Sequence, residues 1–283
     1  MTETTQTEAS ATTPAGAPFP SVLVGIDGSR TSRHAARQAA ILAPEARIRL
    51  LAVTWEQGRG ATATAVLSRW RAEDALAHAD RDLRELGLRP AIEVAEDLDA
   101  TGRLLRESIG HDLLVLGGHA RSRTGGVLVG NTATAALHRT EVPLLIARPL
   151  DDPHTLLDRI LLAIDGSESS LDAARITAAL ARRRQVGDIA IIAPRAVDPP
   201  ARHVLAASAA EIRLATGVEP VVLDEDGPGH RAIVRGAAEQ HSTLIVMGSR
   251  GLHGAYALRS VSERVGHETP CSVLVMHGSL VWP

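Results

Sequence analysis

Two short motifs with the same residues are the places in this sequence where chemistry is most readily expected. Residues 22–29 read VLVGIDGS and residues 161–167 read LLAIDGS, so an apolar run ends in Ile-Asp-Gly-Ser twice. Asp27 and Asp165 each place a carboxylate at the tip of an expected strand, where it can meet a ribose or the edge of an adenine ring. The alternative is a turn in which Asp and Gly satisfy local backbone groups before a helix. The motifs alone leave both interpretations open.

A second pair of motifs follows another apolar run in each half. In the first half, residues 117–132 read GGHARSRTGGVLVGNT. Gly117 can let the backbone approach a phosphate, and Gly130, Asn131 and Thr132 can present helix N-terminal N–H groups and a hydroxyl to it. The alternative is a Gly- and Arg-containing loop with an ordinary helix cap at Asn131 or Thr132.

The charged residues narrow the chemistry further. The chain has a net charge of −3, and all 30 of its cationic side chains are Arg, because it contains no Lys. A basic footprint for nucleic acid is therefore not expected, and a P-loop lysine or a Schiff base is excluded. The candidates for neutralising a phosphate are Arg121, Arg123, Arg250 and Arg259, although solvated loop arginines are the commoner explanation for any one of them.

The wider composition is that of a globular protein of two domains. The chain has 283 residues, 45% of them hydrophobic, and no uninterrupted apolar stretch long enough to span a membrane. The first 18 residues have neither a basic nor an apolar leader region, so we expect a disordered tail. Cys271 is the single cysteine, which excludes intrachain disulfides and agrees with a reducing, cytoplasmic location.

The elements that must position these motifs recur in the same order in both halves. LLVLGG at 113–118 matches LIVMGS at 244–249, and PLLIAR at 143–148 matches SVLVMH at 272–277. This order predicts a diverged duplication. Apolar runs predict strands at 22–26, 48–54, 91–95, 113–117 and 143–147, then at 160–164, 188–193, 218–223, 243–247 and 272–276. Helical stretches between them include 31–43, 63–86, 99–109 and 130–139.

Alternation of strands and helices predicts an α/β fold with two tandem Rossmann-like domains. Each would be a five-stranded, parallel-type sheet with helices on both faces. We place the tail at 1–18, the first domain at 19–149, a linker at 150–157 and the second domain at 158–278. In such a sheet, ligands bind outside the carboxyl ends of the strands, where the motifs described above lie.

Together these motifs resemble those of the tandem universal stress proteins of bacteria, of an actinobacterial type. The resemblance rests on the two IDGS turns, the Gly-x-x-Gly, nine-residue, Gly-Ser/Thr pattern and the ending PCSVLV at 270–275. It covers residues 20–277 and implies two domains that pair through their last strands, often with an adenine nucleotide bound. The ligand implied is ATP, with AMP, ADP and Mg²⁺ as related possibilities, and a homodimer is the expected assembly.

Both copies depart from the family pattern. In the first copy Ala120 replaces the second Gly and Asn131 replaces the Ser/Thr, while the nine-residue spacing is kept. In the second copy Gly248 and Gly251 match, but the loop is two residues short and Arg259 stands where the last Gly belongs. We expect the second copy to be the more damaged. The nucleotide-site residues implied are Asp27, Val53, Gly117, Ala120, Gly130, Asn131, Thr132, Asp165, Gly248, Gly251, Ser260 and Val261.

The leading hypothesis is a stress-response protein that binds ATP or a related adenine nucleotide and acts as a sensor or regulator. No general base, metal cluster or activated nucleophile is visible in the sequence, so at most slow ATP hydrolysis is expected. One alternative is an interaction or dimerisation module that has lost nucleotide binding in one or both domains. Another is an enzyme of the adenine nucleotide α-hydrolase type, which would carry a Ser-Gly-Gly-x-Asp-Ser loop where this chain has Ile-Asp-Gly-Ser.

Overall fold

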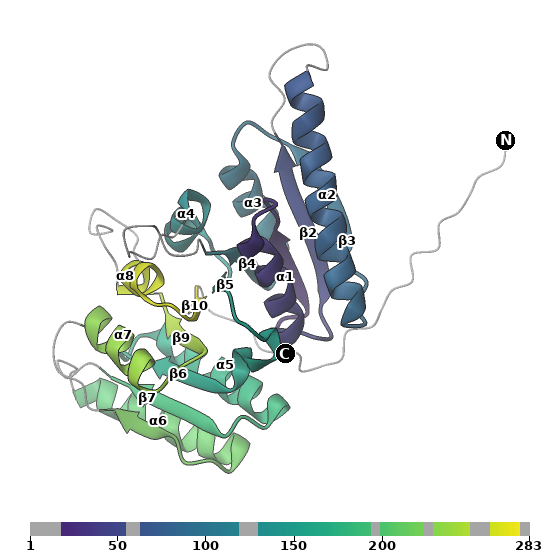
Figure 1. The fold of residues 1–283 in the computed structure, drawn as a ribbon. Helices are drawn as coiled ribbons and strands as arrows, with labels where there is room; N and C mark the ends of the chain where they lie inside the picture. The colour runs from purple at the N-terminus through teal and green to yellow at the C-terminus, as the bar shows by residue number, and fades with distance from the viewer. Residues whose placement is uncertain are drawn as a thin grey trace.

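A single sheet runs through the whole molecule. The structure is a computed structural model that describes residues 18–54, 63–118, 130–193, 199–223, 229–249 and 261–277. Among these residues, ten strands pair in the order β3-β2-β1-β4-β5-β10-β9-β6-β7-β8 (Figure 1). The first domain contributes β1 (Ser21–Gly25), β2 (Arg47–Thr54), β3 (Ala91–Glu96), β4 (Leu113–Gly117) and β5 (Leu144–Ala147). The second domain contributes β6 (Arg159–Ala163), β7 (Asp188–Ile192), β8 (Val221–Leu223), β9 (Leu244–Gly248) and β10 (Ser272–Met276).

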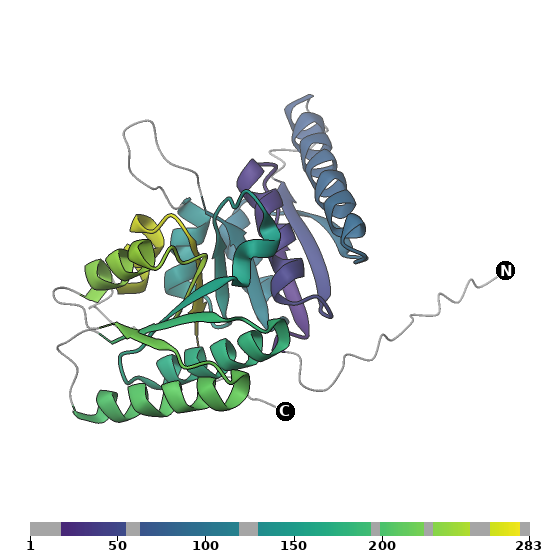
Figure 2. The same cartoon turned by 60° about the horizontal axis from the view of Figure 1, so that its bottom comes forward.

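Helices cover both faces of this sheet (Figures 1 and 2). One face carries α1 (Arg30–Leu42), α2 (Ala63–Glu85), the 3₁₀ helix η1 (Pro153–Leu157), α5 (Glu168–Arg184) and α6 (Pro199–Thr216). The other face carries α3 (Ala100–Ser108), α4 (Asn131–Arg139), α7 (Gly229–Glu239) and α8 (Val261–Glu268). The predicted α/β class and the predicted order of elements are therefore confirmed.

The strands form because their side chains are buried on both faces. In β1, Val22 and Val24 pack into the core under α1 and α2, while Leu23 points into the core under α3 and α4. Alternate residues of one strand thus serve two cores, which is why these strands read as continuous apolar runs. The observed bounds lie within a residue or two of the prediction except at β8. That strand begins at Val221, because Pro220 has no N–H to donate to a neighbouring strand.

The two domains are joined by their last strands. β5 pairs with β10 in antiparallel register, with Leu145 opposite Leu274, whereas every other pair of neighbouring strands is parallel. Each of the two cores contains side chains from both domains. Apolar burial therefore continues across the boundary between β5 and β10, which we call the seam. This confirms the pairing that the family resemblance implied. The segment predicted as a linker also contributes to a core, because Leu156 and Leu157 of η1 are buried.

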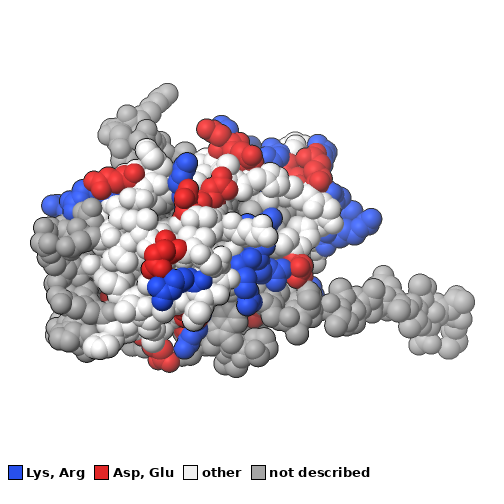
Figure 3. Space-filling view, turned by 90° about the horizontal axis from the view of Figure 1, so that it is seen from below, with Lys and Arg blue, Asp and Glu red and all other residues white. Residues whose placement is uncertain are grey.

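Charged side chains on the surface are of both signs. Figure 3 shows arginines interspersed with Asp and Glu and separated by uncharged residues on the face seen from below. Within the described part of the chain, no helix combines the length and the apolar composition needed to cross a bilayer.

A buried carboxylate fastens α1 to α2. Asp82 of α2 is 5% exposed and accepts hydrogen bonds from Arg33 (3.0 and 2.9 Å) and Arg37 (2.9 Å) of α1. Burial opposes ionisation of Asp82, but the hydrogen bonds from Arg33 and Arg37 outweigh it and hold its pKa below the ordinary value. The two helices that wall one side of the candidate site are therefore held together by an ion pair.

Replacing Asp82 with Asn is expected to lower the free energy of unfolding by about 1–2 kcal/mol, because the two arginines are partly exposed and solvent weakens the pair. Because the pKa of Asp82 is lowered in the folded state, its stabilisation is present above the ordinary Asp pKa of about 3.9 and is lost as the pH falls through the folded pKa. Urea unfolding between pH 3 and 7 measures both effects. Asp188→Asn, at an exposed ion pair with Arg159, is the control and should change stability little.

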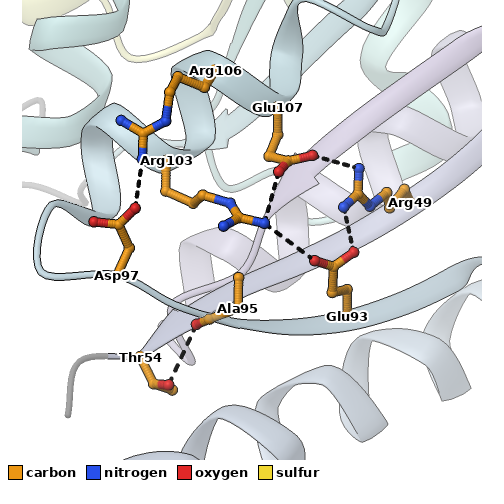
Figure 4. Close-up of polar contacts among 8 residues, drawn as sticks. All are labelled: Arg49, Thr54, Glu93, Ala95, Asp97, Arg103, Arg106 and Glu107. Carbon is orange, nitrogen blue, oxygen red and sulfur yellow. Dashed lines mark hydrogen bonds and ion pairs between the residues drawn. The ribbon is translucent and has the colours of Figure 1, made fainter.

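A second ion-pair network holds α3 against the sheet (Figure 4). Arg49 of β2 pairs with Glu93 of β3 and, at 2.9 Å, with Glu107 of α3, and Arg103 also contacts both carboxylates. By strand register, Ala190 and Leu223 occupy the positions of Arg49 and Glu93 in the second domain. The ion pairs of Arg49 and Glu93 therefore have no equivalent at the corresponding positions of the second domain.

Candidate functional site

The Asp-Gly-Ser turn of the first domain is fixed by two hydrogen bonds and by a glycine with positive φ. Asp27 Oδ1 accepts the backbone N–H of Ser29 at 2.9 Å, which forms an Asx turn. Gly28 has φ +80°, a conformation that favours glycine. Ser29 is the N-cap of α1 and accepts the N–H of Ser32 at 3.1 Å. The local turn that the sequence offered as one interpretation of this motif is therefore present. The same turn fixes the Asp27 carboxylate just beyond the carboxyl end of β1.

The second domain repeats this turn closely. Asp165 Oδ1 accepts the backbone N–H of Ser167 at 3.0 Å and also its hydroxyl at 2.6 Å. Gly166 has φ +84°, and Ser167 caps α5. Ser169 then donates from its hydroxyl to the carbonyl of Ser249 at 2.6 Å. Hydroxyl groups of the second copy are thus engaged with one another and with the neighbouring strand end.

Gly117 and Gly248 are required by packing. A Cβ atom on Gly117 would lie 2.7 Å from the carbonyl carbon of Thr31 and 2.8 Å from the nitrogen of Ser32, both backbone atoms of the first turn of α1. A Cβ on Gly248 would lie 2.6 Å from the nitrogen of Ser170 in the first turn of α5. Glycine at the end of the fourth strand therefore lets the first helix begin directly against it. The close approach that the structure shows at Gly117 is that of a helix, and the approach of a phosphate to the same residue stays a prediction.

The start of α4 has the features of an anion site. Gly130 is the N-cap, with extended backbone and no side-chain cap, so the helix cap that the alternative interpretation put at Asn131 or Thr132 lies at Gly130 instead. The first N–H groups of a helix have no partner within the helix and carry a partial positive charge. Thr132 lies 3.1 Å from Thr101 of α3, hydroxyl to hydroxyl. The start of α4 therefore offers backbone N–H groups that have no partner within the helix, together with the Thr132 hydroxyl, which Thr101 holds in place.

A cavity of about 1240 Å³ lies where these features meet. The residues predicted from the sequence that line it are Asp27, Val53, Gly117, Gly130, Asn131 and Thr132. They lie at or just after the ends of β1, β2 and β4 and at the start of α4. Residues as far apart in sequence as Asp27 and Thr132 therefore meet at one cavity. Ala52, Leu104 and Leu116 add apolar wall on the sheet and on α3. The structure thus brings together every described site residue that we predicted in the first copy.

One wall of the cavity was missed from the sequence. Helix α2 contributes Ser68, Arg71, Asp74 and His78, and α1 contributes Arg33. Arg71, Asp74 and His78 follow a spacing of three and four residues, which places them on one face of a helix. That spacing was visible in the sequence, but it identifies a polar face without indicating what the face is turned toward. Arg33 and Arg71 are the described arginines that line the cavity.

The remaining predicted residues divide into two groups. Ala120, Gly251 and Ser260, with Arg121, Arg123, Arg250 and Arg259, lie outside the described residues. Asp165 and Gly248 occupy the same strand ends in the second domain as Asp27 and Gly117 do in the first, and Val261 is the first residue of α8. Among the residues that the structure describes, no group of three or more His, Cys, Asp or Glu is arranged to hold a metal ion.

Comparison with known proteins agrees with this architecture. The family model described as "Universal stress protein family" matches twice, at residues 18–148 and 157–277. Universal stress protein MT2698 of Mycobacterium tuberculosis is 30% identical over 188 residues, which cover 59% of this chain and 62% of that protein. A universal stress protein of Mycolicibacterium smegmatis is 28% identical over 291 residues, covering 90% of this chain and 96% of that one.

A solved structure shows the same fold. The universal stress protein of Archaeoglobus fulgidus DSM 4304 covers 91% of this chain and 98% of its own, with a TM-score of 0.75 and 22% identity. At that identity the likeness establishes the fold alone. The two matches to the family model, by contrast, span nearly all of both domains. The chain therefore belongs to the universal stress protein family, as a member with two domains in tandem.

Proposed function

We propose that the first domain binds an adenine nucleotide in the cavity between β1, β2, β4 and α4, and that the protein acts as a sensor or regulator of stress through this binding. The observation that carries the proposal is the convergence at one cavity of a fixed carboxylate, Asp27, with the N-terminus of α4. These two features suit opposite ends of a nucleotide. A carboxylate accepts hydrogen bonds from ribose or adenine, and a helix N-terminus attracts phosphate.

The other walls supply complementary contacts. Val53, Leu104 and Leu116 form an apolar surface suited to a base or a sugar ring, and Arg71 adds positive charge, whereas the charge of Arg33 is already paired with Asp82. The ligand proposed is ATP, or AMP or ADP in its place. Oxygen ligands are those that Mg²⁺ prefers, and the carboxylates lining the cavity are Asp27 and Asp74. Hydrolysis is no part of the proposal.

Calorimetric titration with AMP, ADP and ATP, with and without Mg²⁺, tests the proposal. We expect one nucleotide to bind per chain and to stabilise the folded protein, by about 2.7 kcal/mol when the free nucleotide is at 100 times its Kd. Asp27→Asn should weaken binding at least about tenfold, because the amide keeps an acceptor for the Asx turn but loses the charge-assisted hydrogen bond to the ligand.

The second domain offers a matched control for this experiment. Asp165→Asn makes the same change in the same turn and should leave nucleotide affinity unchanged. Absence of binding heat and of thermal stabilisation at millimolar nucleotide would overturn the proposed function. Equal weakening by Asp27→Asn and Asp165→Asn would show that the site has been assigned to the wrong place.

A second proposal concerns the second domain, which we infer serves mainly in interaction. Its supporting observation is the set of hydrogen bonds that join Asp165, Ser167, Ser169 and Ser249 at the equivalent strand ends. The Asx turn recurs in both domains, but in the second the hydroxyl of Ser169 bridges to the strand-end carbonyl of Ser249, whereas in the first Thr31 bonds only to the neighbouring Ser29 hydroxyl among the hydrogen bonds described. A homodimer would form through surfaces other than β5 and β10, since those two strands are paired within the chain.

A further inference from the structure

Arg148 is a buried arginine at the point where the two domains meet. It follows β5 directly and is 2% exposed, which is rare for an arginine because removing its charge from water costs several kcal/mol. Burial also lowers the pKa of its guanidinium. A residue that tolerates this cost must be held by specific contacts, and those contacts reach both Gly118, the neighbour of the cavity residue Gly117, and the second domain.

The first contact is with the C-terminal end of α8. Arg148 Nη2 donates a hydrogen bond to the carbonyl oxygen of Gly266, in the last turn of that helix. The last four carbonyls of a helix lack partners within it and carry partial negative charge, so a guanidinium is favoured there. The other end of α8, at Val261, directly follows in sequence the Gly-containing loop predicted for the second copy. Arg148 of the first domain thus caps a helix of the second.

The second contact is with the strand end that opens the candidate site. Gly118 follows Gly117, which lines the cavity, and its N–H donates to Ala147 at 2.8 Å. A Cβ on Gly118 would lie 2.7 Å from Arg148 Nη1 and 2.9 Å from Cγ2 of Ile146. The guanidinium therefore lies directly against the backbone of Gly118, and any larger residue there would have to displace it.

The backbone of Arg148 is fixed from two further directions. Its carbonyl accepts a hydrogen bond from Gln38 Nε2 of α1 at 2.5 Å, and its N–H donates to Ser272 Oγ of β10 at 3.0 Å. Ser272 Oγ donates in turn to Gln38 Oε1 at 2.7 Å. All three residues are buried. This network therefore connects the second half of α1, through Gln38, with Arg148 beside Gly118 and with the second domain.

The equivalent position in the second copy is built differently. His277 stands where Arg148 stands, Ser249 replaces Gly118, and Leu137 of α4 occupies the place of Gly266 in α8. Gln38 and Ser272 correspond to Ile176 and Pro143, which cannot form the same pair. In one copy the arginine side chain lies between two glycines, and in the other the three corresponding positions carry His277, Ser249 and Leu137. This complementarity marks the arginine contact as a feature of the first domain alone.

We propose that Arg148 is a positioning residue for the nucleotide site of the first domain, holding the strand end at Gly118 against helix α8, so that nucleotide binding in the first domain alters the order of α8 in the second. The inference rests on the proposed function and extends it, because it assigns the seam between the domains a part in binding. It requires no contact between Arg148 and the nucleotide, and Arg148 is not among the residues that line the cavity.

The test compares AMP affinity and amide hydrogen exchange in four proteins. In the wild type, AMP is expected to slow exchange of the α8 amides. Arg148→Met fills much of the same space without the hydrogen bonds, and it should raise the Kd for AMP about tenfold and abolish the change in α8. Arg148→His places in the first copy the residue that the second copy has at the equivalent position, His277, where the fold accommodates it. Histidine is too short to reach both Gly118 and Gly266, so this variant should fold even where Arg148→Met does not, and it should show the same loss.

Arg184→Met is the matched control. Arg184 of α5 also donates across the domain boundary to a last-turn helix carbonyl, that of Ile41 in α1, at 2.8 Å, but it lies at the end of α1 remote from the Asp27 turn. It should leave AMP affinity and the α8 response unchanged. Wild-type affinity in the Arg148 variants, or an α8 response that survives in them, would overturn the inference while leaving the proposed function standing. A wild type that binds no nucleotide would overturn both.

Discussion

Replacing Gly117 with alanine is expected to lower the free energy of unfolding by about 3 kcal/mol, the upper part of the range for overpacked sites. The atoms that the new methyl group would meet belong to the backbone of Thr31 and Ser32, so no side chain can rotate to relieve the contact. The first turn of α1 would have to move away from β4. Urea unfolding of the variant and the wild type measures the loss.

Two further alanine variants make this result specific. Gly248→Ala should cost a similar amount, because the same contact with the first turn of α5 recurs in the second domain. Gly187→Ala is the control, since no atom lies within 4 Å of a Cβ built there, and its stability should stay within about 0.5 kcal/mol of wild type. If Gly117→Ala were as stable as Gly187→Ala, helix packing would not be the reason for glycine at the strand end.

Stability is also expected to fall by about 3 kcal/mol as the pH drops from 6.5 to 4, because of His277. Burial of this ring, reinforced by His138, lowers the pKa of His277 from the ordinary 6.5 to about 4. Its Nε2 has no hydrogen-bond partner among the residues that the structure describes. The unfolded chain therefore takes up the proton at a higher pH than the folded one, so stability declines below pH 6.5 until the folded pKa is reached. Each unit of difference corresponds to about 1.4 kcal/mol.

His277→Leu isolates this effect. Leucine is neutral at every pH, so the variant should lose much less stability between pH 6.5 and 4 than the wild type does. The pKa of His34 is lowered too, by burial and by neighbouring arginines, and it contributes in the same window in both proteins. His154→Gln, at an exposed histidine of η1, should keep the full wild-type slope. Identical slopes in His277→Leu and wild type would contradict the assignment.

Most of the fold could be predicted from local patterns. Strands buried on both faces read as apolar runs, and the repetition of those runs in a fixed order indicated the duplication. What the patterns could not provide depended on contacts distant in sequence. Leu156 and Leu157 lie in a segment whose Pro and Asp residues are typical of a linker, yet both side chains reach a core shared by the two domains.

The candidate site was predictable where it lies on strand ends and helix starts. Asp27 and Thr132 each sit next to a recognisable turn, and the rule for parallel sheets brings such turns to one edge. Arg71 and His78 lie in the middle of a long helix, where a polar face is normally solvated, so only the packing of α2 reveals that they line the cavity. The packing role of Gly117 could not be predicted either. The sequence indicates a helix at 31–43, but it does not show that the first turn of this helix touches Gly117.

A crystal structure of the protein grown with millimolar AMP would test the central claim most directly. We predict density for a nucleotide in the cavity of the first domain, with its phosphate at the start of α4 and its sugar or base beside Asp27, and none beside Asp165. Solvent alone in that cavity, or a nucleotide held only in the second domain, would contradict the account.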